Sequence, residues 1–378
     1  MKIKKVVLRE LALKFKVPFR TSAFNNTVKN FSVVEIHDED GNVGYGECSP
    51  FFVPWYNEET TGGAIIILRN FLIPALFEFG EFKTPEDFWK HTAWIRRNRM
   101  ARSAVDCALW ELYSKQQGLP EWKAIGGVKT EVEAGVSLGI EKSPDDLCRT
   151  VEKYLKQGYH RVKCKIGPGH DIQYLAAVRK QFGDVMLMAD ANSAYTLNDI
   201  PVFKEIDDLN LLMIEQPLAD NDIVDHRHLQ AAIKTPICLD ESIDSLEDAR
   251  RAIELGSCRI INIKVARVGG LTEARRIQKY AGEHGVFCWS GGMLDAGIAR
   301  MHNIAAATLP YYIYPNDIPN SDRYYAEDIV TPSTFVDKNA KIQVPMEVGT
   351  GFKPNMKVIE EATVNKWEYD GAPKIEEK

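Results

Sequence analysis

The sequence predicts an α/β protein in which a (β/α) barrel of the TIM type carries an α+β capping domain. Five short apolar runs between residues 160 and 264 each end in a charged residue, at Lys165, Asp190, Glu215, Asp240 and Lys264. Successive endings are 25, 25, 25 and 24 residues apart, a length that fits one strand, one helix and two short loops. The chain has 378 residues, which suits two domains, one of barrel size.

Residues 1–126 are expected to form the N-terminal capping domain. Residues 3–15 and 31–48 have the composition and alternation of strands, with a hairpin turn at 38–41. The polar and aromatic segment 18–23 between them is expected to be a loop. Apolar residues at three- and four-residue steps then predict helices over 64–76 and 101–113.

The segment 48–56 follows the second strand and contains Phe51, Phe52, Val53, Trp55 and Tyr56 around two prolines. Such a cluster is poorly suited to solvent, and two interpretations stay open. The side chains pack against the neighbouring domain, or they line a substrate pocket.

Residues 127–325 are expected to form the barrel, and residues 326–378 to return to the capping domain with a short strand at 341–344. The alternating pattern predicts a last barrel strand without a regular helix after it. The expected strands are 134–140, 161–166, 185–190, 211–215, 237–240, 259–264, 286–289 and 311–314. The expected helices are 144–157 (with Ser143 as its N-cap), 171–182, 197–209, 225–234, 246–255 and 271–283.

Composition narrows the function classes. The net charge of −6 gives no reason to expect nucleic acid as a partner. No stretch approaches the roughly 18 apolar residues of a membrane span, so no membrane partner is expected. The seven cysteines are scattered without a Cys-x-x-Cys spacing, which indicates buried free thiols in a reducing compartment and a cytoplasmic location.

Three carboxylates end consecutive predicted strands. The C-terminal ends of barrel strands form the active-site rim, so Asp190, Glu215 and Asp240 are expected to converge there. An acid at one strand end often only caps the next helix, but three in register repel each other unless a cation neutralises them. Oxygen ligands alone indicate Mg²⁺ or Mn²⁺ rather than zinc. Asn192 and Glu241 are placed to support these ligands from outside.

Lysines flank the three acids. Lys163 and Lys165 share one face of a strand, and Lys264 ends a strand four units later, roughly across the barrel. Two lysines on opposite sides of a metal reach both faces of a substrate carbon. A nearby cation lowers the pKa of an ammonium group, which would make a neutral amine base accessible near pH 7. The metal would stabilise the charge of an enediolate formed by α-proton removal.

At this point the chain resembles the enolase superfamily, muconate lactonizing enzyme subgroup. Within it, the chain is similar to the family of o-succinylbenzoate synthases and N-succinylamino acid (N-acylamino acid) racemases. The resemblance covers nearly the whole chain. It rests on segments 18–22 (PFRTS), 44–47 (GYGE), 163–165 (KCK), 189–195 (ADANSAY), 214–217 (IEQP), 239–242 (LDES), 262–264 (NIK), 267–270 (RVGG) and 291–294 (GGML).

The resemblance implies roles for these residues. Asp190, Glu215 and Asp240 would bind Mg²⁺, Lys165 would be the acid/base on one face with Lys163 tuning it, and Lys264 would lie on the other. The substrate would be a small carboxylate, and the protein a homo-oligomer. The two N-terminal loops would close over the site. The implied substrate-binding residues are Phe19, Thr21, Ser22, Ser137, Ser290, Gly291, Gly292 and Met293.

The same residues support two reactions. In synthase chemistry, the leading hypothesis, Lys165 removes an α-proton and helps a hydroxyl leave as water, while Lys264 remains a cation. In racemase chemistry one lysine takes the proton and the other returns it. A dipeptide epimerase is disfavoured because segment 291–293 lacks an Asp-x-Asp motif, and a non-catalytic scaffold protein because all five charged residues are present.

The chain departs from the family at one position. Asp295 stands where the family usually has glutamate after Gly-Gly-Met-Leu. Its carboxyl group is one methylene shorter, which puts in question any hydrogen bond to Lys264 or to its own loop.

Overall fold

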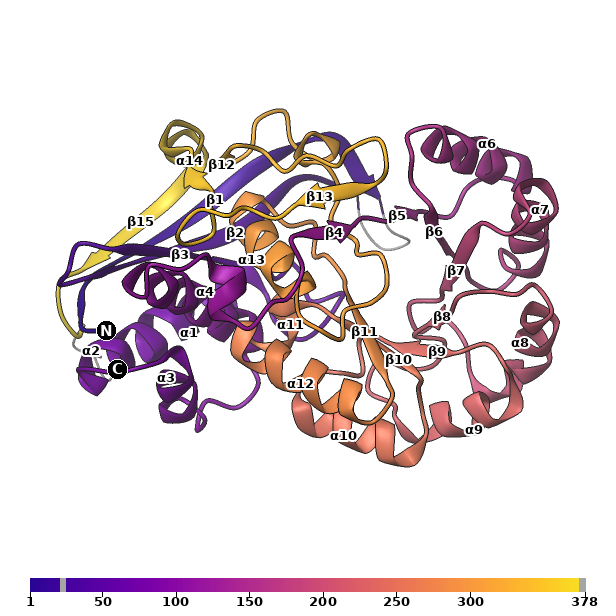
Figure 1. Ribbon diagram of the computed structural model, residues 1–378, viewed down its shortest axis with the longest axis horizontal. Coiled ribbons are helices and arrows are strands. Elements are labelled where there is room, and N and C mark those ends of the chain that lie inside the picture. Colours follow the sequence, from indigo (N-terminus) through magenta and orange to yellow (C-terminus); the bar gives the residue numbers. More distant parts are fainter. Residues whose placement is uncertain (21–24, 374–378) are drawn as a thin grey trace.

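The computed structural model describes residues 1–20 and 25–373. An antiparallel sheet and a parallel barrel sheet organise these residues (Figure 1). The antiparallel sheet contains β1 (Ile3–Arg20), β2 (Asn25–Asp38), β3 (Val43–Cys48) and β15 (Thr363–Tyr369), in the order β15-β1-β2-β3. The last strand of the chain therefore pairs with the first, and Figure 1 shows it beside β1 in yellow.

The loop expected at 18–23 is wrong for residues 18–20, which continue β1. Phe19 pairs with Asn26 and Arg20 with Asn25, after a register shift beyond Lys14. The returning strand supplies backbone partners here, which outweighs the break that Pro18 introduces. The other residues of the expected loop, 21–23, lie outside the described residues.

A series of helical segments follows the first three strands, and part of it packs against the antiparallel sheet. These segments are α1 (Thr61–Ile67), the π-helical turn η1 (Leu68–Leu72), α2 (Ile73–Phe79), α3 (Pro85–His91), α4 (Arg99–Gln116) and the short α5 (Glu121–Ala124). The buried helix α4 crosses β3 at the two glycines of the 44–47 motif. A Cβ atom at Gly44 would lie 2.0 Å from the carbonyl oxygen of Ala108, and one at Gly46 would lie 1.7 Å from that of Ala104. Only glycine permits this close approach.

The expectation that no apolar stretch reaches the length of a membrane span is wrong. The helical residues Thr61–Phe79 are long and apolar enough by length and composition, with a mean hydropathy of 1.5 over 18 residues. One side of this helix, including Leu68, Leu72 and Leu76, packs into the core of the N-terminal region. Its apolar character is therefore that of a core helix.

Seven parallel strands form the barrel sheet, in chain order. They are β5 (Val136–Leu138), β6 (Arg161–Lys165), β7 (Met186–Asp190), β8 (Ile214–Glu215), β9 (Ile237–Leu239), β10 (Ile260–Ile263) and β11 (Phe287–Ser290). The helices between them lie outside the curved sheet in Figure 1. They are α6 (Pro144–Leu155), α7 (Ile172–Phe182), η2 (Leu197–Asp199), α8 (Ile200–Asp207), α9 (Val224–Ala232), α10 (Leu246–Leu255), α11 (Val265–Val268) and α12 (Leu271–Glu283). Ser143 caps α6 as predicted, accepting a hydrogen bond from the Asp146 amide.

The eighth strand, expected at 311–314, is wrong as a regular strand. Only isolated bridges join this part of the chain to its neighbours, Tyr312 to Cys288 and Asn316 to Ala134. Pro310 and Pro315 flank the segment and lack backbone N–H donors, which prevents a continuous ladder. The backbone of 311–317 still bonds to both β11 and the β4–β5 side, so it completes the ring irregularly.

The remaining elements connect the two regions. They are β4 (Glu131–Glu133), α13 (Gly297–Ala307), the 3₁₀ turn η3 (Ser321–Arg323), β12 (Val330–Thr331), β13 (Lys341–Gln343), β14 (Lys353–Pro354) and α14 (Met356–Ala362). Helices α11 and α13 were not predicted from the sequence. The limits of the domains, 1–126, 127–325 and 326–378, stay predictions. All seven cysteines are buried and free, as expected.

Candidate active site

The three predicted metal ligands lie at the C-terminal ends of adjacent strands. Strand register places Lys165 beside Asp190 and Asp190 beside Glu215. Glu215 pairs with Cys238, so Asp240 follows just beyond the end of β9. All three carboxylates are buried. The 25-residue period therefore does place these side chains along one rim.

Lys163 lies among the carboxylates rather than at their edge. Its Nζ is 3.3 Å from Asp190, 3.0 Å from Glu215 and 2.9 Å from Asp317. Burial alone would lower the pKa of Lys163, but the three carboxylates outweigh burial and raise it well above the ordinary value. Lys163 is therefore a fixed cation.

Lys165 is more accessible, with 37% of its side chain exposed. Its Nζ lies 3.7 Å from Asp190 and hydrogen-bonds to Oδ1 of Asn192. Asn192 in turn donates from Nδ2 to Oε1 of Glu241, at 3.1 Å. The two residues expected to support the metal ligands thus contact each other beside Lys165.

Lys264 lies on the other side of the acids, at the end of β10. Its Nζ is 2.8 Å from Asp240 and 3.0 Å from the Tyr56 hydroxyl oxygen. Arg267 of α11 also bonds to Asp240 and, at 3.2 Å, to the same hydroxyl. Burial would lower the pKa of Lys264, but Asp240, Tyr56 and Glu241 together outweigh burial and raise it. The lowered lysine pKa expected from the sequence presupposes a cation bound beside the lysine, so it stays a prediction.

The carboxylates fit a divalent cation by their chemistry, although they are not assembled around one. Within residues 1–20 and 25–373, no three His, Cys, Asp or Glu side chains converge closely enough to hold a metal, because Lys163, Lys264 and Arg267 occupy the acids. Burial, aided by Asp240, raises the pKa of Glu241 to about 7. Its Oε2 is buried without a hydrogen-bond partner among the described residues. A cation bound beside Asp240 would neutralise the Glu241 carboxylate, which has no counter-charge of its own.

Comparison with known proteins places the chain in a family. Residues 3–126 match the family model described as mandelate racemase / muconate lactonizing enzyme, N-terminal domain. Residues 146–358 match the one described as enolase C-terminal domain-like. The chain belongs to the enolase superfamily. This confirms the resemblance found in the sequence motifs and the predicted fold class.

Relatives within the enolase superfamily match the whole chain. An o-succinylbenzoate synthase of Geobacillus kaustophilus is 48% identical over 96% of this chain and 96% of its own. An N-succinylamino acid racemase of Thermus thermophilus is 41% identical over 96% and 98%. A crystal structure of an enolase superfamily member from Listeria innocua superposes with a TM-score of 0.95 at 42% identity, covering 97% of this chain and 99% of that one.

Sequence analysis did not assign roles to four residues of this superfamily site. Asp317 bonds to Lys163, Arg161 and Ser137, and Asn262 donates from Nδ2 to Oε1 of Glu215 at 2.7 Å. Tyr56 contacts both Lys264 and Arg267, and Arg267 contacts Asp240, the ion-pair partner of Lys264. Asn262 and Arg267 belong to quoted motifs, and Tyr56 to the aromatic segment 48–56. Asp317 follows the predicted strand 311–314, which was the signal that could have found it.

The segment 48–56 packs on its own N-terminal region and reaches the barrel through one side chain. Phe51 and Tyr56 pack against the core of the N-terminal region, and the Tyr56 hydroxyl reaches Lys264 of the barrel. The Tyr56 contact joins this segment to the barrel, and the lining of a substrate pocket stays a prediction.

The predicted substrate-binding residues fall into three groups. Ser137 donates from Oγ to Asp317 at 2.7 Å, and the Ser290 hydroxyl is buried without a partner among the described residues. Gly291 lies against Asn262, where a Cβ would approach Oδ1 to 2.4 Å; the other two residues of this group are Gly292 and Met293. The predicted residues Thr21 and Ser22, and the side chain of Phe19, lie outside the described part of the chain.

Asp295 bonds to its own loop. Its Oδ2 accepts from the Met293 amide at 2.9 Å and from Nδ2 of Asn303 at 3.0 Å. No contact to Lys264 is found among the described residues. The shorter carboxylate thus keeps a loop-holding role.

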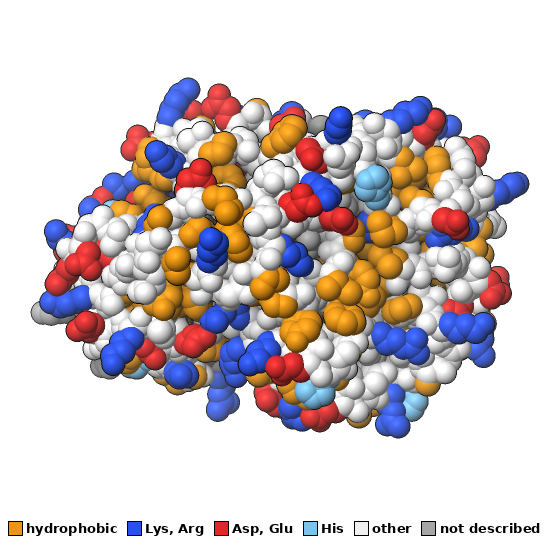
Figure 2. Space-filling model, in the orientation of Figure 1, with side chains coloured by type: hydrophobic (Ala, Val, Ile, Leu, Met, Phe, Trp, Pro, Cys, Tyr) orange, Lys and Arg blue, Asp and Glu red, His pale blue; other side chains and the backbone are white. Residues whose placement is uncertain are grey.

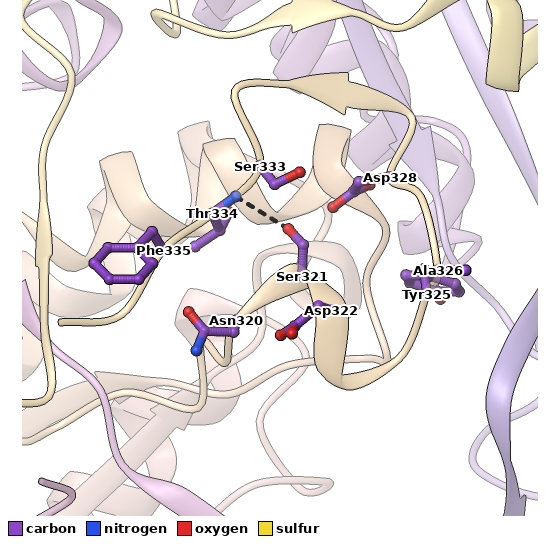
Figure 3. Close-up of a pocket in the computed structure, with 9 residues that line it drawn as sticks. All are labelled: Asn320, Ser321, Asp322, Tyr325, Ala326, Asp328, Ser333, Thr334 and Phe335. Atoms are coloured by element: carbon purple, nitrogen blue, oxygen red, sulfur yellow. Dashed lines mark hydrogen bonds between the residues drawn. The ribbon is translucent and has the colours of Figure 1, made fainter. Parts of the chain in front are cut away.

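A cavity of about 270 Å³ lies apart from these residues. Its lining comes from segments 320–328 and 333–335, and Figure 3 shows the Thr334 amide bonded to Ser321 Oγ there. None of the predicted site residues lines it. On the face in Figure 2, basic and acidic side chains are interspersed, so no basic surface stands out there.

Proposed function

We propose that this protein is an o-succinylbenzoate synthase that acts on 2-succinyl-6-hydroxy-2,4-cyclohexadiene-1-carboxylate in menaquinone synthesis. One observation carries the proposal: Lys165 and Lys264 lie on opposite sides of Asp190, Glu215 and Asp240 in the order of the barrel strands. Relatives bearing this name, from Geobacillus kaustophilus and Bacillus subtilis, are 48% and 46% identical.

A divalent ion would complete the site. Asp190, Glu215 and Asp240 would hold Mg²⁺, or Mn²⁺, with Asn192 and Glu241 supporting them. Bound there, the ion would supply positive charge to the substrate carboxylate. Dipeptide epimerases of this fold, from Enterococcus faecalis and Cytophaga hutchinsonii, were solved with Mg, which supports this choice of metal.

In the synthase reaction Lys165 performs both proton transfers. Lys165, as the free amine, takes the α-proton, and the electrons of the C–H bond form the new ring double bond. The C–O bond to the hydroxyl breaks, and the Lys165 ammonium returns the proton so that water leaves and the ring becomes aromatic. Lys264 stays an ammonium and stabilises the negative charge that develops, as its contact with Asp240 favours. Lys163 holds the carboxylates in place.

The second candidate is racemisation of N-succinyl or other N-acyl amino acids. Lys264 favours it, because an amine on the second face can return a proton that Lys165 has removed. The relatives from Thermus thermophilus and Amycolatopsis, 41% and 40% identical, bear the name N-succinylamino acid racemase. Dipeptide epimerisation has weaker support, from a relative 29% identical.

Substrate contacts and context complete the proposal. Ser137 and segment 290–293 would bind the carboxylate arm of the substrate. The N-terminal segment that contains Phe19, Thr21 and Ser22 would close over this arm, and Asp295 would hold the loop that carries segment 290–293. We place the protein in the cytoplasm, as a homo-oligomer acting on a small carboxylate and not on nucleic acid or membrane. The buried free thiols agree with a reducing compartment.

Turnover assays test the two candidates directly. The purified chain with Mg²⁺ is mixed with the cyclohexadiene substrate, and aromatic product is followed by ultraviolet absorbance. N-succinyl-L-phenylalanine is followed separately by polarimetry. Product in the first assay supports the synthase; optical inversion alone would make the racemase the function; neither product would overturn both.

A further inference from the structure

Tyr56 links the N-terminal region to one of the two lysines. It ends an aromatic group in which the rings of Phe51 and Trp55 are 4.6 Å apart and those of Trp55 and Tyr56 are 6.0 Å apart. Phe51 and Tyr56 also pack against the N-terminal core. The tyrosine is therefore held by a different part of the chain from the barrel strand that carries Lys264.

The Tyr56 side chain contacts the Lys264 amine in two ways. The hydroxyl oxygen accepts from Nζ at 3.0 Å, and Nζ lies 4.5 Å from the ring centroid. Arg267 donates to the same oxygen at 3.2 Å. A tyrosine hydroxyl has two acceptor lone pairs, and Lys264 and Arg267 use one each. Tyr56 and Asp240 together thus fix the position of Nζ from two directions.

We infer that Tyr56 is a positioning residue. It holds the Nζ atom of Lys264 where that atom can exchange a proton with the substrate α-carbon, which is more than Lys264 needs to act as a fixed positive charge. The inference rests on the proposed function, because the two candidate reactions require different things of Lys264. Elimination needs only the positive charge of Lys264, which acts over several ångströms. Proton transfer needs hydrogen-bond geometry at the α-carbon, so a small displacement of Nζ is costly.

Loss of the Tyr56 contact should affect only one enantiomer of a racemase substrate. Each enantiomer of an N-succinyl amino acid presents its α-proton to one lysine. Loss of the Tyr56 hydroxyl should slow removal of the α-proton that faces Lys264 and leave removal by Lys165 unaffected, since Lys165 bonds to Asn192 instead. A purely structural role of Tyr56 would slow both equally.

The test uses Tyr56→Phe, which keeps the ring beneath Nζ and removes only the acceptor. Tyr45→Phe is the matched control, because Tyr45 lies in β3 of the same N-terminal region and also has a lysine near its ring, Lys115, 5.8 Å from the ring centroid. Exchange of the α-proton is followed by proton NMR in D₂O with Mg²⁺, separately for N-succinyl-D- and N-succinyl-L-phenylalanine. Synthase turnover is measured in parallel, and circular dichroism checks folding.

We expect exchange to fall by about tenfold to a hundredfold for one enantiomer, as for loss of one hydrogen bond to a charged group. Exchange of the other enantiomer by Tyr56→Phe, and exchange of both enantiomers by the Tyr45→Phe control, should stay within about threefold of wild type, which is under 1 kcal/mol. Synthase turnover by Tyr56→Phe should fall by a smaller factor than exchange of the affected enantiomer. Equal losses for both enantiomers, or no loss, would overturn the inference. If Tyr56→Phe does not fold, Trp55→Phe, which loosens the same group, must reproduce the one-sided loss or the inference fails. Wild-type protein inactive in both assays would instead refute the proposed function.

Discussion

The buried pair of Lys29 and Glu47 joins the N-terminal sheet to the loop that follows β11. Nζ and Oε1 are 3.0 Å apart, and only 4% and 0% of the two side chains are exposed. Lys29 also donates to the Leu294 carbonyl at 2.9 Å, and Glu47 accepts from the Ala296 and Ala299 amides. Replacing Lys29 with methionine keeps most of the volume and removes the charge.

The expected loss in the free energy of unfolding follows from the buried carboxylate that remains after Lys29→Met. Glu47 would stay buried without its cation, and breaking a buried pair in this way costs about 3–5 kcal/mol. In the wild type, burial would raise the pKa of Glu47, but Lys29 and the backbone amides together lower it. Its stabilising contribution is therefore present above its unfolded pKa and is lost as the pH falls through the folded value. Without Lys29 burial dominates, so the destabilisation should be largest near pH 7 and smaller near pH 5.

Urea unfolding followed by tryptophan fluorescence measures this at both pH values. Lys5→Met, which breaks the exposed pair with Glu368, is the control and should leave the unfolding midpoint unchanged. The double variant Lys29→Met/Glu47→Gln should recover part of the loss, because no buried charge is left unpaired. A loss below about 1 kcal/mol for Lys29→Met, or one that grows as the pH falls, would refute this account of the pair.

Three further predictions concern the metal, a buried histidine and the substrate arm. Removing divalent ions with EDTA should abolish both activities, and Mg²⁺ or Mn²⁺ should restore them; activity that survives dialysis against EDTA contradicts the metal assignment. Burial lowers the pKa of His302, but Glu121, 3.0 Å away, outweighs this and raises it to about 9. The stability advantage of wild type over His302→Gln, measured by urea unfolding, should therefore be full below about pH 6.5 and shrink as the pH rises through 9. Ser137→Ala should raise KM for the succinyl substrate by about threefold to tenfold with a smaller change in kcat, and an unchanged KM in steady-state assays argues against that contact.

The sequence was sufficient for the rim of the barrel because its order is local and periodic. Each strand ends one repeat after the last, so Lys165, Asp190 and Glu215 could be placed side by side without a structure. The eighth strand failed for an equally local reason, since Pro310 and Pro315 interrupt its backbone donors.

Contacts between distant segments could not be predicted. Asp317 lies in the irregular closing segment, and its bonds to Lys163 and Arg161 exist only once the ring is complete. Tyr56 was found as part of an aromatic segment, but its contact with Lys264 requires the N-terminal region to be docked on the barrel. The ion pair of Lys264 with Asp240 could likewise not be read from the spacing.

The central claim is that Lys165 and Lys264 face opposite sides of one substrate carbon, so that each lysine can exchange only the α-proton on its own side. The most direct measurement is α-proton exchange in D₂O for each enantiomer of N-succinylphenylalanine, with Lys165→Ala and Lys264→Ala compared with wild type. We predict that racemisation is lost in both variants, while each retains exchange with one enantiomer only, and not the same one. Unchanged exchange in Lys165→Ala, or loss confined to the same enantiomer in both variants, would contradict the claim.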